Sequence, residues 1–100
     1  MGWAAHHIER LKAGETVKFR PRGNSMVGRI ESGDLVTVAP AHLDEIKVND
    51  IVLCKVRGTE YLHIVKAIRG AEYQIGKNVG RINGWTSARQ IFGKVIAIDP

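Results

Sequence analysis

The chain has little cysteine, few aromatic residues and no long apolar run. Cys54 is its only cysteine, so no internal disulfide can form. Aromatic residues make up 6% of the chain, which leaves no set of rings on which nucleic-acid bases could stack. No apolar stretch approaches the roughly 20 residues needed to cross a bilayer. These shortages exclude a disulfide-stabilised domain and argue against a membrane-spanning helix.

The N-terminal residues are too polar for a secretion signal. His6, His7, Glu9 and Arg10 occupy the stretch where such a signal needs its apolar centre. The sequence therefore predicts a soluble, cytoplasmic protein that has no membrane partner.

Length and composition indicate one ordinary globular domain. At 100 residues, with 44% hydrophobic and 25% charged residues, the chain suits a single domain over residues 1–100 with one small core. Cys54 lies in the apolar run 52–56 and is expected to be a small core residue.

The net charge of +5 could favour nucleic acid or an acidic partner, but the basic residues are dispersed. The densest group is Lys18, Arg20 and Arg22. In a strand, alternate residues share a face, so these three side chains lie opposite Val17 and Phe19. A solvated outer face explains this spacing better than a binding stripe, and nucleic acid is an unlikely partner.

The periodicity of apolar residues changes once along the chain. Residues 3–12 place their apolar side chains on one side of a helix, which Ala13 and Gly14 end. From Glu15 onward the period is that of strands, so residues 1–14 are predicted to hold a short helix and residues 15–100 a β body. Strands are expected at 17–19, 35–39, 51–56, 61–68, 72–75 and 90–98, with Pro40 between two of them. The predicted fold is mainly β with one short N-terminal helix.

Residues 23–26 read Gly-Asn-Ser-Met, and Ile30, Gly33 and Asp34 follow before an apolar strand at 35–38. An uncharged Ser-Met pair in a glycine-marked turn before a strand is how one class of serine proteases presents its nucleophile. Two later segments continue the pattern: residues 48–53 read Val-Asn-Asp-Ile-Val-Leu, and Gly-Lys-Asn at 76–78 leads to Ile-Phe-Gly-Lys-Val at 91–95. In this order, the motifs resemble those of the signal peptidase and LexA-repressor superfamily. A proline that the family carries after the Ser-Met pair is missing here.

The resemblance implies a compact, strongly bent β domain with Ser25 as the nucleophile and no cofactor or metal. In signal peptidases the general base lies in a strand reading Tyr-Ile-Lys-Arg-Val, which aligns with Tyr-Leu-His-Ile-Val at 61–65. His63 then occupies the lysine position, where signal peptidases of the endoplasmic reticulum and of archaea also carry histidine. The resemblance therefore implies a Ser25–His63 catalytic dyad.

Lys66 is the alternative base, because it is the only lysine in that strand. It lies three residues from His63, so a regular strand would point the two side chains to opposite faces. Histidine also needs less tuning, since its ordinary pKa of about 6.5 leaves it mostly neutral at cytosolic pH. Lys66 is accordingly expected to be a solvent-facing charge.

The chain departs from the family at two supporting positions. Gly23 stands where many signal peptidases have a serine that holds the oxyanion, so backbone N–H groups, including that of Ser25, must serve. The acidic residue of the last motif is also missing, since Lys77, Arg81 and Asn83 occupy that region. The resemblance thus implies a dyad without an orienting third group.

The remaining polar candidates suggest structural roles. His6, His7 and His42 lack the spacing of a metal site. Asp34 and Asp50 match turn positions that precede strands, and are expected to stabilise those turns rather than act as acids.

Two functional hypotheses follow. The first is a soluble serine endopeptidase-like domain that cuts an extended peptide or protein substrate bound along a strand edge. The second is a catalytically inactive copy of the fold that acts as a dimerisation or peptide-binding module, with a homodimer as a possible state. A weaker third is nucleic-acid binding through the face of Lys18, Arg20 and Arg22.

Overall fold

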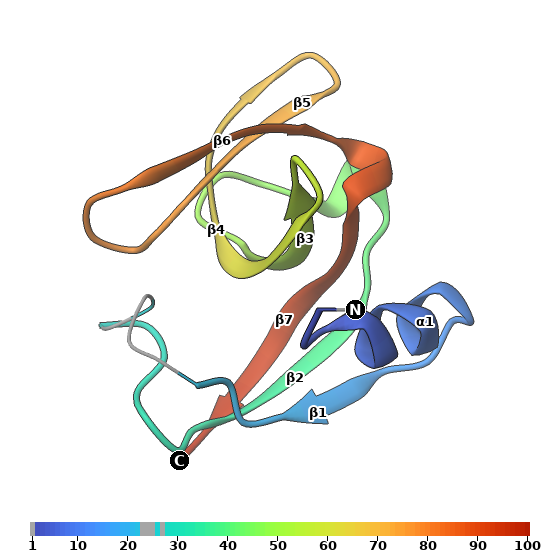
Figure 1. The fold of residues 1–100 in the computed structure, drawn as a ribbon, viewed down its shortest axis with the longest axis vertical. Coiled ribbons are helices and arrows are strands. Elements are labelled where there is room, and N and C mark those ends of the chain that lie inside the picture. Colours follow the sequence, from blue (N-terminus) through green and yellow to red (C-terminus); the bar gives the residue numbers. More distant parts are fainter. Residues whose placement is uncertain (1, 23–25, 27) are drawn as a thin grey trace.

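The computed structural model describes residues 2–22, 26 and 28–100. These residues form a seven-stranded antiparallel sheet with one α-helix and two short 3-10 helices (Figure 1). The elements are α1 (Ala5–Lys12), β1 (Val17–Phe19), β2 (Leu35–Pro40), η1 (Leu43–Glu45), β3 (Ile51–Val56), β4 (Thr59–Arg69), β5 (Glu72–Gly76), β6 (Ile82–Ser87), η2 (Ala88–Gln90) and β7 (Ile91–Asp99). The predicted mainly-β fold with one short helix is confirmed.

Most predicted strands agree with the observed ones, and the differences have local causes. β6 was not among the expected strands, because its Asn83-Gly84 pair is typical of a turn; pairing with β5 holds it extended. Pro40 was expected between strands but is the last residue of β2, opposite Gly93. A proline is tolerated there because the ladder ends at that point.

The strand order is β1-β2-β7-β3-β4-β5-β6, so the C-terminal strand lies near the middle of the sheet. Residues 93–99 of β7 pair with β2, and residues 91–94 of β7 pair with β3. Irregular register in both pairings, and again between β4 and β5, lets the sheet bend.

The sheet curls until β6 approaches β3, although two strands separate them in the pairing order. The Thr86 hydroxyl on β6 donates a hydrogen bond to the backbone oxygen of Lys55 on β3, at 2.7 Å. This hydrogen bond joins β6, an edge strand of the sheet, to β3, with which it does not pair.

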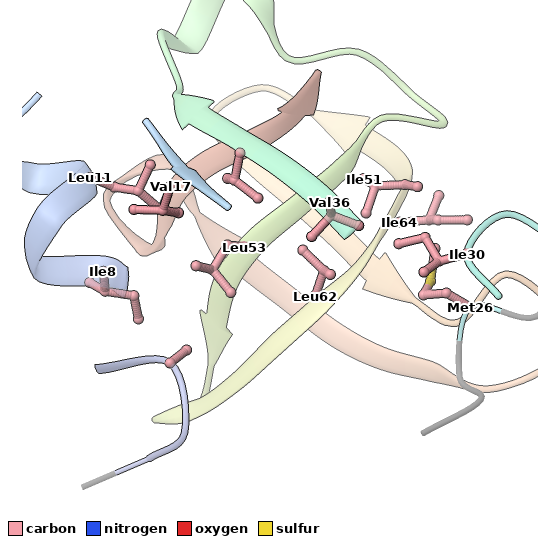
Figure 2. Close-up of a cluster of buried hydrophobic side chains, with 12 residues drawn as sticks. Ile8, Leu11, Val17, Met26, Ile30, Val36, Ile51, Leu53, Leu62 and Ile64 are labelled. Carbon is pink, nitrogen blue, oxygen red and sulfur yellow. The ribbon is translucent and has the colours of Figure 1, made fainter. Parts of the chain in front are cut away.

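Both faces of β3 are buried over residues 51–54, which explains the apolar sequence of that part of the strand. Ile51 and Leu53 point into one cluster, which α1, β1 and β2 cover. Val52 and Cys54 point into a second cluster inside the curl. In Figure 2, Met26 and Ile30 lie at one end of the first cluster, and the side chains from α1 lie at the other.

Cys54 is fully buried, as expected for a core residue. Burial raises the pKa of its thiol to about 12, so the thiol stays protonated at neutral pH. It is therefore neither a nucleophile nor a metal ligand under ordinary conditions.

α1 is amphipathic and packs through Ile8 and Leu11. The helix ends at Lys12, and Gly14 just beyond it has a φ of +88° that suits glycine. The N–H of Gly14 donates to the Leu11 carbonyl and that of Glu15 to the Arg10 carbonyl, the hydrogen-bond pattern of a Schellman motif. Within the described part of the chain, no helix has the length and apolar character that crossing a membrane requires.

The two aspartates expected in turns occupy them. Asp34 accepts a hydrogen bond from the N–H of Glu31, and Asp50 from that of Lys47, each at 2.8 Å. Asn49 has a φ of +80°, a conformation that asparagine tolerates better than most residues.

Candidate active site

His63 lies in the buried part of β4. Its backbone pairs with Val52 of β3, and its side chain is 6% exposed. A polar imidazole in such a position needs a hydrogen-bond partner, because an unpaired buried polar group is costly.

Asn83 provides that partner from β6. Nδ1 of His63 lies 2.6 Å from Oδ1 of Asn83. An amide oxygen has no proton, so Nδ1 must donate. In the neutral ring this leaves Nε2 without a proton and able to accept one, which is the tautomer that a general base requires.

The surroundings keep the His63 ring neutral. Burial is the main cause that lowers its pKa, and the positive charge of Lys77 lowers the pKa further. The hydrogen bond to Asn83 acts in the opposite direction and raises the pKa. The net result is a pKa below the ordinary 6.5, so at neutral pH the ring is available as a base.

Tyr61 packs against the His63 ring. The two residues are two apart on β4, and their ring centroids are 4.8 Å apart with planes inclined by 29°. Together with the Asn83 hydrogen bond, this stacking restricts rotation of the imidazole.

Lys66, the alternative base, occupies an irregular position. The ladder with β5 pairs Val65 with Ile75 and then Ala67 with Gln74, so Lys66 is the bulged residue. Its ammonium group donates to the backbone oxygen of Asn78 at 3.1 Å. The residue is half-buried, so Lys66 is less exposed than the solvent-facing charge that the sequence predicted.

A cavity of about 500 Å³ opens beside His63. Arg22 and Met26, which precede and follow the segment 23–25, line this cavity together with His63. Ser25 and Gly23 lie outside the described residues. The Ser25–His63 contact and the oxyanion role of the backbone at Ser25 therefore stay predictions.

Asn83 is the site residue that sequence reasoning missed. The sequence interpretation expected no partner for His63 from this region, whereas the Asn83 side chain hydrogen-bonds to the His63 ring. The sequence interpretation considered only an acidic residue as a partner for His63. An asparagine has nearly the same shape as an aspartate, and its side-chain oxygen also accepts a hydrogen bond. The position of Asn83 in the last motif could have marked it as a candidate partner of His63. The bend of the sheet that brings β6 to His63 could not be predicted from the sequence.

The other histidines do not form a metal site. His7 stacks on Phe19 at 4.3 Å between centroids and lines the cavity. Burial is the largest cause that lowers its pKa. The part of the chain that the structure describes contains no group of three or more His, Cys, Asp or Glu residues able to hold a metal ion.

Comparisons with known proteins assign the chain to no family. No protein-family model matches the chain, and no curated protein matches it in sequence.

Proposed function

We propose that this chain is a serine endopeptidase that uses Ser25 as nucleophile, His63 as general base and Asn83 to position the base. Within that class it would be a peptidase of the signal-peptidase and LexA type, with histidine in place of the usual lysine. The observation that carries the proposal is the state of His63. His63 is buried, its imidazole is hydrogen-bonded through Nδ1, and the residue lines a cavity that Arg22 and Met26, on either side of residues 23–25, also line.

The chemistry requires one proton relay. Nε2 of His63 takes the proton from the Ser25 hydroxyl while the oxygen attacks the peptide carbonyl. The protonated ring then gives that proton to the leaving amine, and an acyl-enzyme remains. Water, deprotonated by the same Nε2, releases the acyl group and regenerates the serine.

Asn83 supports this relay without taking part in it. The hydrogen bond at Nδ1 keeps the proton on that nitrogen and keeps Nε2 as the acceptor. The Cys-His-Asn arrangement of papain-like proteases assigns an asparagine the same task.

His63 is a better base than Lys66 in this chain. The pKa of His63 is already below 6.5, and the residue lines the cavity. The Lys66 amine is directed to the carbonyl of Asn78 and does not belong to the described lining of that cavity.

A serine-directed fluorophosphonate tests the proposal. We expect wild-type protein to be labelled once, at Ser25, and both Ser25→Ala and His63→Ala to lose labelling while they keep the far-ultraviolet circular dichroism of a β domain. Intact mass and peptide mapping measure the labelling. Ser87→Ala is the matched control, because Ser87 is exposed at the end of β6, and it should label like the wild type.

Two outcomes would contradict the proposal. Labelling that survives in Ser25→Ala would place the reactive group elsewhere. No labelling of a folded wild type at any pH would favour the second hypothesis, an inactive copy of the fold that binds peptides or dimerises.

A further inference from the structure

We infer that the cavity beside His63 binds a large apolar side chain of the substrate peptide, and that an acidic residue next to it is held by Arg20 and Arg22. This inference rests on the proposed function, because it names the kind of peptide that the same site would take.

The walls of the cavity are mainly apolar. Trp3 and Phe19 contact each other with centroids 5.8 Å apart, and both rings line the cavity with Met26 and Ile30. Trp3 remains 54% exposed, so its ring is available to a ligand. Such a surface releases ordered water when it accepts an apolar side chain.

The size of the cavity fits more than a small residue. Its volume of about 500 Å³ lies within the roughly 300–1,000 Å³ of ligand pockets in proteins. An alanine side chain would leave most of that apolar wall in contact with water, whereas an aromatic ring would cover it.

The charges at the cavity are mainly positive. Arg20 and Arg22 are exposed there. The Arg20 guanidinium donates to the Gly33 carbonyl, which is a neutral partner. The ion pairs among the described residues join other side chains, so neither arginine charge is neutralised by one of them.

One acidic side chain among the described residues offsets part of this positive charge, and it contacts the N-terminal segment. Among the described lining residues only Glu60 is acidic, and its carboxylate accepts a hydrogen bond from the backbone N–H of Ala4 at 3.0 Å. This contact holds the N-terminal segment, and with it Trp3, against β4. A carboxylate from outside therefore meets two arginine charges and one glutamate charge among the described lining residues, so the net charge there is positive.

The geometry places this subsite next to the chemistry. His63 lines the same cavity as the two arginines, so the residue that fills it lies close to the bond that would be cut. Side chains alternate along an extended peptide, so the acidic residue adjacent in sequence lies outside the cavity, where we expect the exposed side chains of Arg20 and Arg22 to contact it.

Binding to Ser25→Ala tests the inference without turnover. The probe is a fluorescein-labelled, Gly/Ser-rich peptide with Asp-Phe-Asp at its centre, measured by fluorescence anisotropy. The comparison peptides carry Asp-Ala-Asp, Asn-Phe-Asn and Lys-Phe-Lys. We expect Asp-Ala-Asp to bind at least about tenfold more weakly, because the ring is no longer buried. We expect Asn-Phe-Asn to bind about two- to fivefold more weakly, as for an exposed ion pair.

Two variants assign these preferences to their residues. Arg22→Gln should reduce the preference for Asp-Phe-Asp over Asn-Phe-Asn, and Trp3→Ala should reduce the preference for Phe over Ala. Arg89→Gln is the control, because Arg89 is exposed on η2 and does not line the cavity; it should keep both preferences.

Equal binding of all four peptides would overturn the inference, as would tighter binding of Lys-Phe-Lys. A dimer in sedimentation velocity that Trp3→Ala dissociates would also overturn it, because a second copy would then fill the cavity. The proposed function is judged separately. Specific peptide binding with no fluorophosphonate labelling would support the subsite and contradict the peptidase function. Labelling without any peptide preference would support the peptidase function and contradict the subsite.

Discussion

His63 shows how one buried side chain can be prepared for proton transfer by its immediate neighbours. Burial and the Lys77 charge lower its pKa, and Asn83 fixes the proton on Nδ1. In this respect histidine differs from a lysine base, whose pKa must be lowered by burial before the amine can accept a proton.

Replacing Asn83 should separate positioning from catalysis. In Asn83→Ala the imidazole loses its partner and can adopt the other tautomer, so the rate of fluorophosphonate labelling should fall at least about tenfold. Asn83→Asp restores an acceptor and adds a negative charge, which favours the charged ring and raises the pKa of His63. We expect this variant to recover labelling at alkaline pH, with the acid side of its pH profile moved to higher pH.

Equal labelling rates of Asn83→Ala and the wild type over the whole pH range would contradict a positioning role for Asn83. The hydrogen bond would then serve only the fold, and the stability of the variant, measured by urea denaturation, would show that role.

Lys77 should control the pH range of the reaction. The base must be neutral, so the rate is lost as the pH falls through the lowered pKa of His63. Lys77→Gln removes a positive charge that disfavours the imidazolium, so the pKa of His63 should rise and activity should be lost at a higher pH than in the wild type. Activity at alkaline pH should be unchanged.

The labelling rate as a function of pH, with His63 followed by NMR titration, measures this effect. Lys18→Gln is the matched control, since Lys18 is exposed on β1. A shift of the same size in both variants would show a general effect of net charge rather than a local one.

The Ala13-Gly14 bond, a candidate site of self-cleavage, lies in the turn that follows α1. An Ala-Gly bond is the kind that LexA-type proteins cut in themselves, and residues 13 and 14 form one. In this chain the bond lies in the Schellman turn, and the ion pair of Arg10 with Glu15 at 3.0 Å spans it.

We therefore expect no self-cleavage at Ala13-Gly14. The 11 residues between this bond and Ser25 could span about 36 Å when extended, so length alone does not forbid it. The obstacle is β1, which pairs with β2 and buries Val17; releasing it would cost several kcal/mol (about 1.5–3 kcal/mol for Val17 alone). Intact mass after long incubation at neutral and alkaline pH checks this. Loss of the first 13 residues in the wild type but not in Ser25→Ala would show a self-processing protein.

The curl of the sheet is the feature of the whole molecule on which the site depends. β6 carries Asn83, and it reaches His63 because the sheet bends back toward β3. The hydrogen bond from Thr86 to the Lys55 carbonyl closes that bend.

Thr86→Val should weaken the closure and the site together. The Lys55 carbonyl would lose its side-chain donor, and we expect unfolding to become easier by about 1–3 kcal/mol. Labelling of Ser25 should slow in parallel if the Asn83–His63 contact loosens. Urea denaturation measures the stability, and Thr59→Val is the control because Thr59 is exposed on β4. A fully stable Thr86→Val protein with normal labelling would show that β6 is held by its pairing with β5 alone.

The sequence by itself determined the elements that follow from local periodicity and turn chemistry. The apolar alternation located β1, the apolar run at 51–56 located β3, and the Ala13-Gly14 pair marked the end of α1. The motif order also pointed to His63 as a candidate base before its surroundings were known. Each of these depends on neighbours in the chain, which a sequence displays directly.

Only the tertiary structure decided which residues meet. The contact of His63 with Asn83 joins positions 20 residues apart, and it exists because the sheet bends at irregular pairings that no residue pattern announces. The bulge at Lys66 is of the same kind, since an extra residue in one strand interrupts the regular alternation on which the prediction for Lys66 depended. The cavity likewise forms where the N-terminal segment, β1 and β4 come together. Long-range packing, rather than local preference, therefore arranges the candidate site.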